Sequence, residues 1–165
     1  MKIPAAQYGD ILCVNSAGLA DAAIRWWTDS TVNHVACCIG NNEIIDATPF
    51  RGVRRRSIME ESEGNTWQLL RLKAQFNSML SPGREKLSAT WLAAQQGKGY
   101  DYLGIFGFPL DKDIHDSHRY VCSRLAYVWQ LKRGIPVIER TPAGLVSPQG
   151  VFGSSLFEII DEHRN

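Results

Sequence analysis

Hydrophobic positions along the chain follow two periods, one typical of strands and one typical of helices. Short apolar runs rich in β-branched residues, each bounded by turn residues, predict strands. These runs cover residues 9–14, 33–39, 43–48 and 67–72, with shorter extended pieces from Val53 and over 156–160. The strand predictions alternate with helical patterns rather than forming one continuous block.

Apolar residues at helical spacing predict helices over 18–28, 82–96 and 120–133, and a short one after Ser147-Pro148. Serine followed by proline, as at Ser81-Pro82, is typical of an N-cap and a first helical position. Glycine is typical of helix ends, and Gly97 and Gly134 follow two of the predicted helices. Helices interleaved with a small, mostly antiparallel sheet predict an α+β fold in one domain spanning residues 1–165.

Residues 40–42 (Gly-Asn-Asn) predict the turn of a β-hairpin between the second and third strands. If the turn is centred on Asn41, residues whose numbers sum to about 82 face one another, and His34 and Asp46 share a face of the hairpin. A two-residue turn at Asn41-Asn42 would instead send Asp46 to the opposite face. Both alternatives remain open from the sequence.

Composition and charge narrow the class of protein. The 165 residues carry a formal net charge of only +1, so no overall positive field indicates a nucleic-acid partner. A basic run at 54–56 and an acidic run at 60–63 are typical of a solvated face, with contact to an anionic substrate as the alternative.

No apolar run approaches the ~18 residues of a membrane span, so stable membrane insertion is not expected. The first residues lack the apolar region of a secretory signal, which favours a cytoplasmic location, with release by lysis or another export route as alternatives. The oligomeric state is left open.

The chain has four cysteines, Cys13, Cys37, Cys38 and Cys122. No pair has C-x-x-C spacing, so no zinc or redox site is predicted, and a disulfide scaffold is not expected in an unexported chain. We expect no cofactor and no metal. His115 and His118 form a minor alternative base or metal site without a clear third partner.

Cys122 lies in the first turn of a predicted helix, where unpaired amides and the helix dipole favour a thiolate. His34 begins an apolar strand, and a base on a rigid strand is better placed than one in a polar loop. Each residue alone also has a purely structural interpretation, as packing at a helix start or within a strand. Together a thiol and an imidazole form a reactive ion pair.

A carboxylate at Asp46 would hydrogen-bond the imidazole, fix its tautomer and stabilise the imidazolium, if the hairpin places it on the same face. The alternative is a strand-edge aspartate in water. Tyr8, Tyr100 and Tyr102 are candidate donors to a substrate oxyanion, beside backbone amides at the nucleophile.

Several short segments occur in a characteristic order. They are Gly9-Asp10-Ile11-Leu12, the 23–30 segment ending Thr-Asp-Ser, Asn33-His34-Val35-Ala36-Cys37-Cys38-Ile39-Gly40, Asp46-Ala47 before Gly52-Val53, Tyr100-Asp101, Tyr120-Val121-Cys122-Ser123-Arg124-Leu125, and Thr141-Pro142 or Ser147-Pro148. Their order and spacing, over roughly residues 9–160, resemble the permuted NlpC-like cysteine hydrolases. The resemblance is to the YiiX/YebB-like group, distant relatives of lecithin retinol acyltransferase.

This resemblance implies a permuted papain-like fold in which Cys122 is the nucleophile, His34 the base and Asp46 the third polar residue. Three positions depart from the family pattern: Asn33 stands where serine is usual, and Asp46 and Arg124 stand where glutamate is common. The first two departures keep the catalytic group plausible. The third bears more on the substrate than on the nucleophile.

The resemblance implies a cysteine hydrolase that cleaves an amide, with a peptide or a peptidoglycan stem peptide as its partner. A second hypothesis is a lipid ester or thioester hydrolase or acyltransferase with the same Cys–His pair, in which aromatic segments line an acyl site rather than the core. A third is a non-catalytic binding or structural module with a degenerate site. Thiol labelling separates the third from the others, and turnover of lipid against peptidoglycan fragments separates the first two.

Overall fold

A computed structural model describes residues 5–16, 31–104, 116–138 and 145–164. One sheet of six strands, ordered β4-β3-β2-β1-β5-β8 with antiparallel neighbours, organises these residues. The strands are β1 (Ile11–Asn15), β2 (His34–Gly40), β3 (Glu43–Thr48), β4 (Gly52–Ser57), β5 (Thr66–Leu72) and β8 (Phe157–His163). The sheet confirms the predicted strands and the mostly antiparallel pairing.

The helices start where the sequence predicted caps. The Ser81 hydroxyl accepts a hydrogen bond from the Arg84 amide, and the Ser147 hydroxyl accepts one from the Gly150 amide. The helices are α2 (Ile58–Ser62), the 3₁₀ helix η1 (Ala74–Met79), α3 (Pro82–Ala93), α5 (Cys122–Arg133) and α6 (Pro148–Phe152). The helix predicted over 18–28 lies outside the described residues.

The start of α5 differs from its prediction by two residues. Tyr120 belongs to β7 (Arg119–Tyr120), which pairs in parallel with β6 (Gly99–Tyr100), so the chain is still extended there. The helix therefore begins at Cys122, and Val121 is its extended N-cap. This pairing brings residues 99–100 beside the segment that leads into Cys122.

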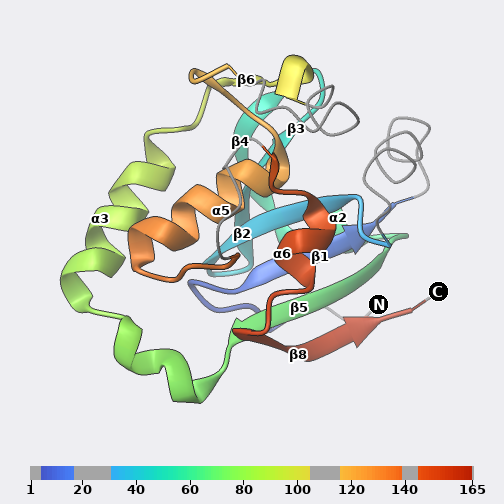
Figure 1. Ribbon diagram of the computed structural model, residues 1–165. Coiled ribbons are helices and arrows are strands. Elements are labelled where there is room, and N and C mark those ends of the chain that lie inside the picture. The colour runs from blue at the N-terminus through green and yellow to red at the C-terminus, as the bar shows by residue number, and fades with distance from the viewer. Residues whose placement is uncertain (1–4, 17–30, 105–115, 139–144, 165) are drawn as a thin grey trace.

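The helices α3, α5 and α6 lie on one face of the sheet (Figure 1), whereas Ile58 of α2 packs in the cluster on the opposite face. α5 lies across β2 and β3, and α3 packs against the outer side of α5. Alternate strand residues, such as Val35 and Cys37, join Leu125 and Trp129 of α5 in the larger core cluster. Their neighbours on the opposite face, such as Ala36, form a second cluster. This arrangement confirms the α+β class.

The sequence contained no apolar run long enough to predict a membrane span. Among the residues that the structure describes, no helix is long and apolar enough to cross a membrane.

Candidate functional site

A bulge in the β2–β3 hairpin decides which face Asp46 occupies. Asn41 and Asn42 both have positive φ, 53° and 59°, and Gly40 pairs with Glu43, so the turn has two residues. That turn alone would separate Asp46 from His34. The register shifts between Cys38 and Gly40, however, so that Cys38 pairs with Ile44 and Cys37 with Ile45. The extra residue of this bulge returns Asp46 to the face of His34.

His34 and Asp46 meet in a buried hydrogen bond. His34 Nε2 lies 2.8 Å from Asp46 Oδ2. His34 is the first residue of β2 and is 7% exposed, and Asp46, in the middle of β3, is fully buried. Both partners sit on paired strands, so their backbones hold the ring and the carboxylate in a fixed relation. This is the arrangement that orients an imidazole.

Cys122 lies at the N-terminus of α5, where the helix meets the start of β2. Cys122 lies near enough to His34 for its charge and its hydrogen-bonding capacity to raise the pKa of the imidazole. Val121 provides no side-chain cap to this helix end, which leaves the first amides of α5 without that partner. Cys122 is 4% exposed, so the thiol and the imidazole meet where little water reaches them.

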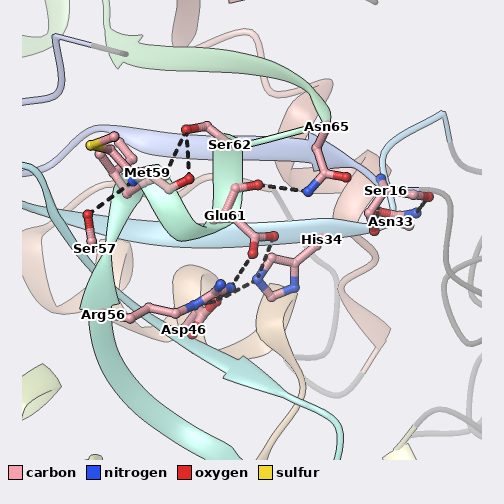
Figure 2. Close-up of polar contacts among 11 residues, drawn as sticks. Ser16, Asn33, His34, Asp46, Arg56, Ser57, Met59, Glu61, Ser62 and Asn65 are labelled. Atoms are coloured by element: carbon pink, nitrogen blue, oxygen red, sulfur yellow. Dashed lines mark hydrogen bonds and ion pairs between the residues drawn. The ribbon is translucent and has the colours of Figure 1, made fainter. Parts of the chain in front are cut away.

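Two further charged residues complete the cluster around Asp46 (Figure 2). Arg56 Nε lies 3.0 Å from Asp46 Oδ2, and Arg56 Nη2 contacts both Asp46 Oδ2 and Glu61 Oε2. Glu61 Oε1 lies 3.7 Å from His34 Nε2. The side chains of Arg56 and Glu61 are 8% and 12% exposed. One guanidinium thus holds two carboxylates that both face the imidazole.

The cluster favours a protonated His34. Burial, the largest influence, lowers the pKa of His34, but the charges of Glu61 and Cys122 and hydrogen bonding with Asp46 and Cys122 oppose it. The net result is a pKa well above the ordinary 6.5. Burial raises the pKa of Asp46, but hydrogen bonds and charges from His34 and Arg56 outweigh it and lower that pKa. The favoured state is an imidazolium between anions.

The remaining cysteines behave as core residues. Cys13, Cys37 and Cys38 are all at most 1% exposed. Burial raises the pKa of each of these thiols, which keeps them neutral. They act as small hydrophobic residues of the core.

The structure separates Tyr8 from the cluster. The Tyr8 hydroxyl lies 2.9 Å from Ser88 Oγ in α3 and accepts a hydrogen bond from Trp129 Nε1 at 3.3 Å. Trp129 is about two helical turns along α5 from Cys122, roughly 10 Å. Tyr8 therefore packs between helices, because its ring fits edge-on against the Trp129 indole. It is not brought to His34 and Cys122.

Tyr100 and Tyr102 lie nearer to the nucleophile segment. Tyr100 is buried and pairs with Tyr120 through the backbone. Its ring packs against that of half-exposed Tyr102 at 5.2 Å. The Tyr102 hydroxyl accepts a hydrogen bond from the Phe50 amide at 2.7 Å. An oxyanion role for either tyrosine stays a prediction.

The histidines of the polar loop take no part in the described cluster. His118 is exposed, and its Nδ1 lies 3.6 Å from Asp116 Oδ1. His115 lies outside the described residues.

Two departures from the family pattern have structural roles. The Asn33 side chain brackets Ser16, accepting from its amide at 3.1 Å and donating to its carbonyl at 2.8 Å. Arg124 is 8% exposed and donates to the carbonyls of Asp116 and Arg119. Arg124 thus ties down the segment before Cys122. The sequence interpretation had linked this position with the substrate.

Sequence reasoning missed Arg56 and Glu61, because it assigned both charge runs to a solvated face. That interpretation is wrong for these two residues. Strand alternation carried a usable signal: Arg56 pairs with Ile44, so it shares the face of Asp46, whereas Arg55 points away and makes an exposed pair with Glu43. Residue Glu61 gave no such signal, because the short helix α2 had not been predicted.

Potential metal ligands also meet in this cluster. His34, Asp46 and Glu61 each offer a ligand atom within 4.8 Å of the others. Arg56 lies among them and contacts both carboxylates. Asp46 Oδ1 is buried and has no hydrogen-bond partner among the described residues.

Comparison with known proteins supports the fold. No protein-family model matches the chain, and no curated protein sequence matches it either. A solved structure does match: the metalloprotein YiiX from Escherichia coli O157:H7, described as DUF1105, with a TM-score of 0.71. The similarity covers 96% of this chain and 98% of that one at 20% sequence identity. This chain has a YiiX-like fold.

Proposed function

We propose that the protein is a cysteine hydrolase that cleaves an amide bond in a peptide or a peptidoglycan stem peptide. The observation that carries this proposal is the buried His34–Asp46 hydrogen bond beside Cys122, which lies at the N-terminus of α5 and raises the pKa of His34. The YiiX-like fold supports it, because the sequence resemblance pointed to the same group. The permuted NlpC-like relationship, and the more distant one to lecithin retinol acyltransferase, belong to this proposal.

In the proposed reaction the Cys122 thiolate attacks the carbonyl carbon of the amide. The carbonyl oxygen becomes an oxyanion, for which the amides at the start of α5 are the nearest donors by position. The tetrahedral intermediate collapses, the carbon–nitrogen bond breaks, and the His34 imidazolium gives its proton to the leaving amine. Neutral His34 then takes a proton from water, which attacks the thioester and releases the acid. Asp46 keeps the ring oriented through both halves.

Ester or thioester substrates, including lipids, are the alternative for the same pair of residues. The chemistry differs only in the leaving group, which is an alcohol or thiol instead of an amine. Turnover of a peptidoglycan fragment against a lipid ester, with Cys122→Ala as the blank in both assays, separates the two substrates. A protein inactive on both would fit the third hypothesis, a binding module.

A metal-dependent mechanism receives a separate test because the structural neighbour is described as a metalloprotein. The side chains of His34, Asp46 and Glu61 do not fit a bound cation in their present arrangement. The Arg56 guanidinium already contacts both carboxylates. The His34 nitrogen that faces them, Nε2, is already hydrogen-bonded to Asp46. We therefore derive no step through a metal.

Removal of metal should leave the thiol chemistry unchanged. After dialysis against EDTA, the rate of iodoacetamide labelling at Cys122 should stay within about twofold of the untreated rate. The reason is that Arg56 supplies the positive charge between the carboxylates. A labelling rate that changes tenfold on EDTA treatment and returns with added Zn²⁺ would contradict this assignment.

The Cys–His pair itself is tested by labelling at low pH. An ordinary thiol with a pKa near ~8.5 is only about 1% thiolate at pH 6.5. We expect iodoacetamide to label Cys122 at pH 6.5 at least about tenfold faster in the wild type than in His34→Ala. Mass spectrometry of the Cys122 peptide measures the rate, and buried Cys13 provides an internal reference.

His118→Ala is the matched control, because it removes an exposed histidine near Cys122 in sequence. Its labelling rate should equal that of the wild type. Circular dichroism of each variant separates a lost pair from a lost fold. Equally slow labelling of Cys122 in the wild type and in His34→Ala would contradict the pair and favour the binding module.

A further inference from the structure

A cavity of about 390 Å³ lies beside the nucleophile segment. It forms where the β3–β4 turn meets β6 and β7, and Figure 1 places β6 at that end of the molecule. Its principal side chains are Phe50, Arg51, Lys98, Tyr100, Tyr102 and Arg119. One lining residue, Tyr100, pairs through its backbone with Tyr120, two residues before Cys122.

Close backbone packing builds this cavity. The Val53 amide donates to the Lys98 carbonyl at 2.8 Å, and the Gly97 amide donates to the Val53 carbonyl at 2.9 Å. Gly52 has φ +65°, and a Cβ there would lie 2.1 Å from the Lys98 carbonyl oxygen. Only glycine lets the turn and the 97–99 segment approach so closely. The cavity floor is thus held by the fold.

The cavity is strongly cationic in a chain of nearly balanced charge. Three of its described lining side chains are Arg51, Lys98 and Arg119, and none of the described lining residues is acidic. Lys98 Nζ donates to Gln95 Oε1 at 2.7 Å, and Arg119 Nε lies 3.2 Å from Asp116 Oδ2. Within the described residues, no such bond or ion pair engages the Arg51 guanidinium. Arg51 therefore remains available to an anion.

An aromatic wall stands beside these cations. Phe50 is 92% exposed and has φ 65°, a conformation that is uncommon and costly for a bulky residue. The Tyr102 hydroxyl accepts a hydrogen bond from the Phe50 amide, and the centroids of the Phe50 and Tyr102 rings lie 6.1 Å apart. The turn and the Tyr102 hydroxyl hold the backbone of Phe50, while its ring stays exposed and available to a ligand.

We propose that this cavity binds a carboxylate of the substrate and so selects acidic peptides. The guanidinium of Arg51 would take the carboxylate, Lys98 and Arg119 would add positive charge, and the Phe50 ring would cover the apolar part next to it. The substrate class is therefore a short peptide with a free carboxylate near the scissile amide. That the bound peptide is a substrate rests on the proposed hydrolase function. Binding itself needs no catalysis.

The test compares two probes on the Cys122→Ala protein, which cannot turn them over. The probes are N-acetyl-Ala-Ala and its C-terminal amide. NMR titrations measure the binding of each probe through the backbone amide chemical shifts of Gly97 and Gly99. We expect the carboxylate form to bind at least about tenfold more tightly than the amide. In Arg51→Gln this preference should fall to within about twofold. Arg55→Gln, which changes an exposed arginine outside the cavity, should keep it.

Either of two results would overturn the proposal: no measurable preference for the carboxylate in the parent protein, including no binding of either probe, or an unchanged preference in Arg51→Gln. Failure of the hydrolase proposal looks different, because slow labelling at Cys122 leaves the binding preference untouched. A preference for the carboxylate that disappears in Arg51→Gln and persists in Arg55→Gln supports the cavity as an anion site, whether or not Cys122 proves to be reactive.

Discussion

Replacing Arg56 by methionine should lower the free energy of unfolding by about 3–5 kcal/mol, because it leaves the two poorly hydrated carboxylates of Asp46 and Glu61 with only the His34 imidazolium to neutralise them. Asp46 is fully buried, and the side chain of Glu61 is 12% exposed. Methionine keeps a flexible, unbranched chain in the same space, so the loss reports on charge more than on packing. Urea denaturation at pH 7, followed by circular dichroism, measures the change.

The neighbouring arginine supplies the control. Arg55→Met removes a guanidinium that is 52% exposed and paired with Glu43 at the surface, so it should cost less than about 1 kcal/mol. The double variant Arg56→Met/Glu61→Gln should recover part of the loss, since it also removes one uncompensated carboxylate. Equal effects of Arg55→Met and Arg56→Met would contradict the buried cluster.

This comparison of adjacent arginines also marks how far sequence reasoning reached. Strands, caps and the positions of Cys122 and His34 followed from local pattern, because apolar period and turn residues act over a few residues. Arg56 did not, because burial of an arginine depends on the carboxylates that meet it. Glu61, the second of those carboxylates, arrives on the five-residue helix α2, which is too short for a periodic signal.

The position of Asp46 is the clearest case. The turn at Asn41 and Asn42 has two residues, as their left-handed φ values show, and that turn alone predicts the wrong face. The bulge after Cys38 reverses the outcome. Gly40 takes the left-handed conformation at this bulge, with φ 83°, but in the sequence a glycine before two asparagines fits a plain turn equally well. The sequence therefore left two alternatives that only the paired strands could decide.

The place of Tyr8 could not be predicted for a related reason. A tyrosine near the chain start can reach many places, and its ring went where an indole edge and two hydrogen-bond partners were available. Tyr100 came close to Cys122 only through the two-residue pairing of β6 with β7. So short a pairing leaves no periodic pattern in the sequence.

Protonation of His34 should govern stability above neutral pH. Its folded pKa is raised well above 6.5, so its contribution to stability is fully present below pH 6.5 and is lost as the pH rises through the folded value. We expect the unfolding free energy of the wild type to fall toward that of His34→Gln as the pH increases from 6 to 10. Urea denaturation of both proteins across this range gives the difference directly.

Glu61 sets where that loss occurs. Burial, the largest influence, lowers the pKa of His34. The negative charge of Glu61 is the largest of the influences that raise this pKa. In Glu61→Gln the His34 ring should therefore lose its proton at a lower pH, and the advantage over His34→Gln should disappear at a correspondingly lower pH. NMR titration of the His34 ring protons measures the midpoint, and Glu60→Gln, at the adjacent exposed position, should leave it in place. An unchanged midpoint in Glu61→Gln would mean that Asp46 and the Cys122 thiolate alone hold the proton on His34, and that Glu61 serves only to fix Arg56.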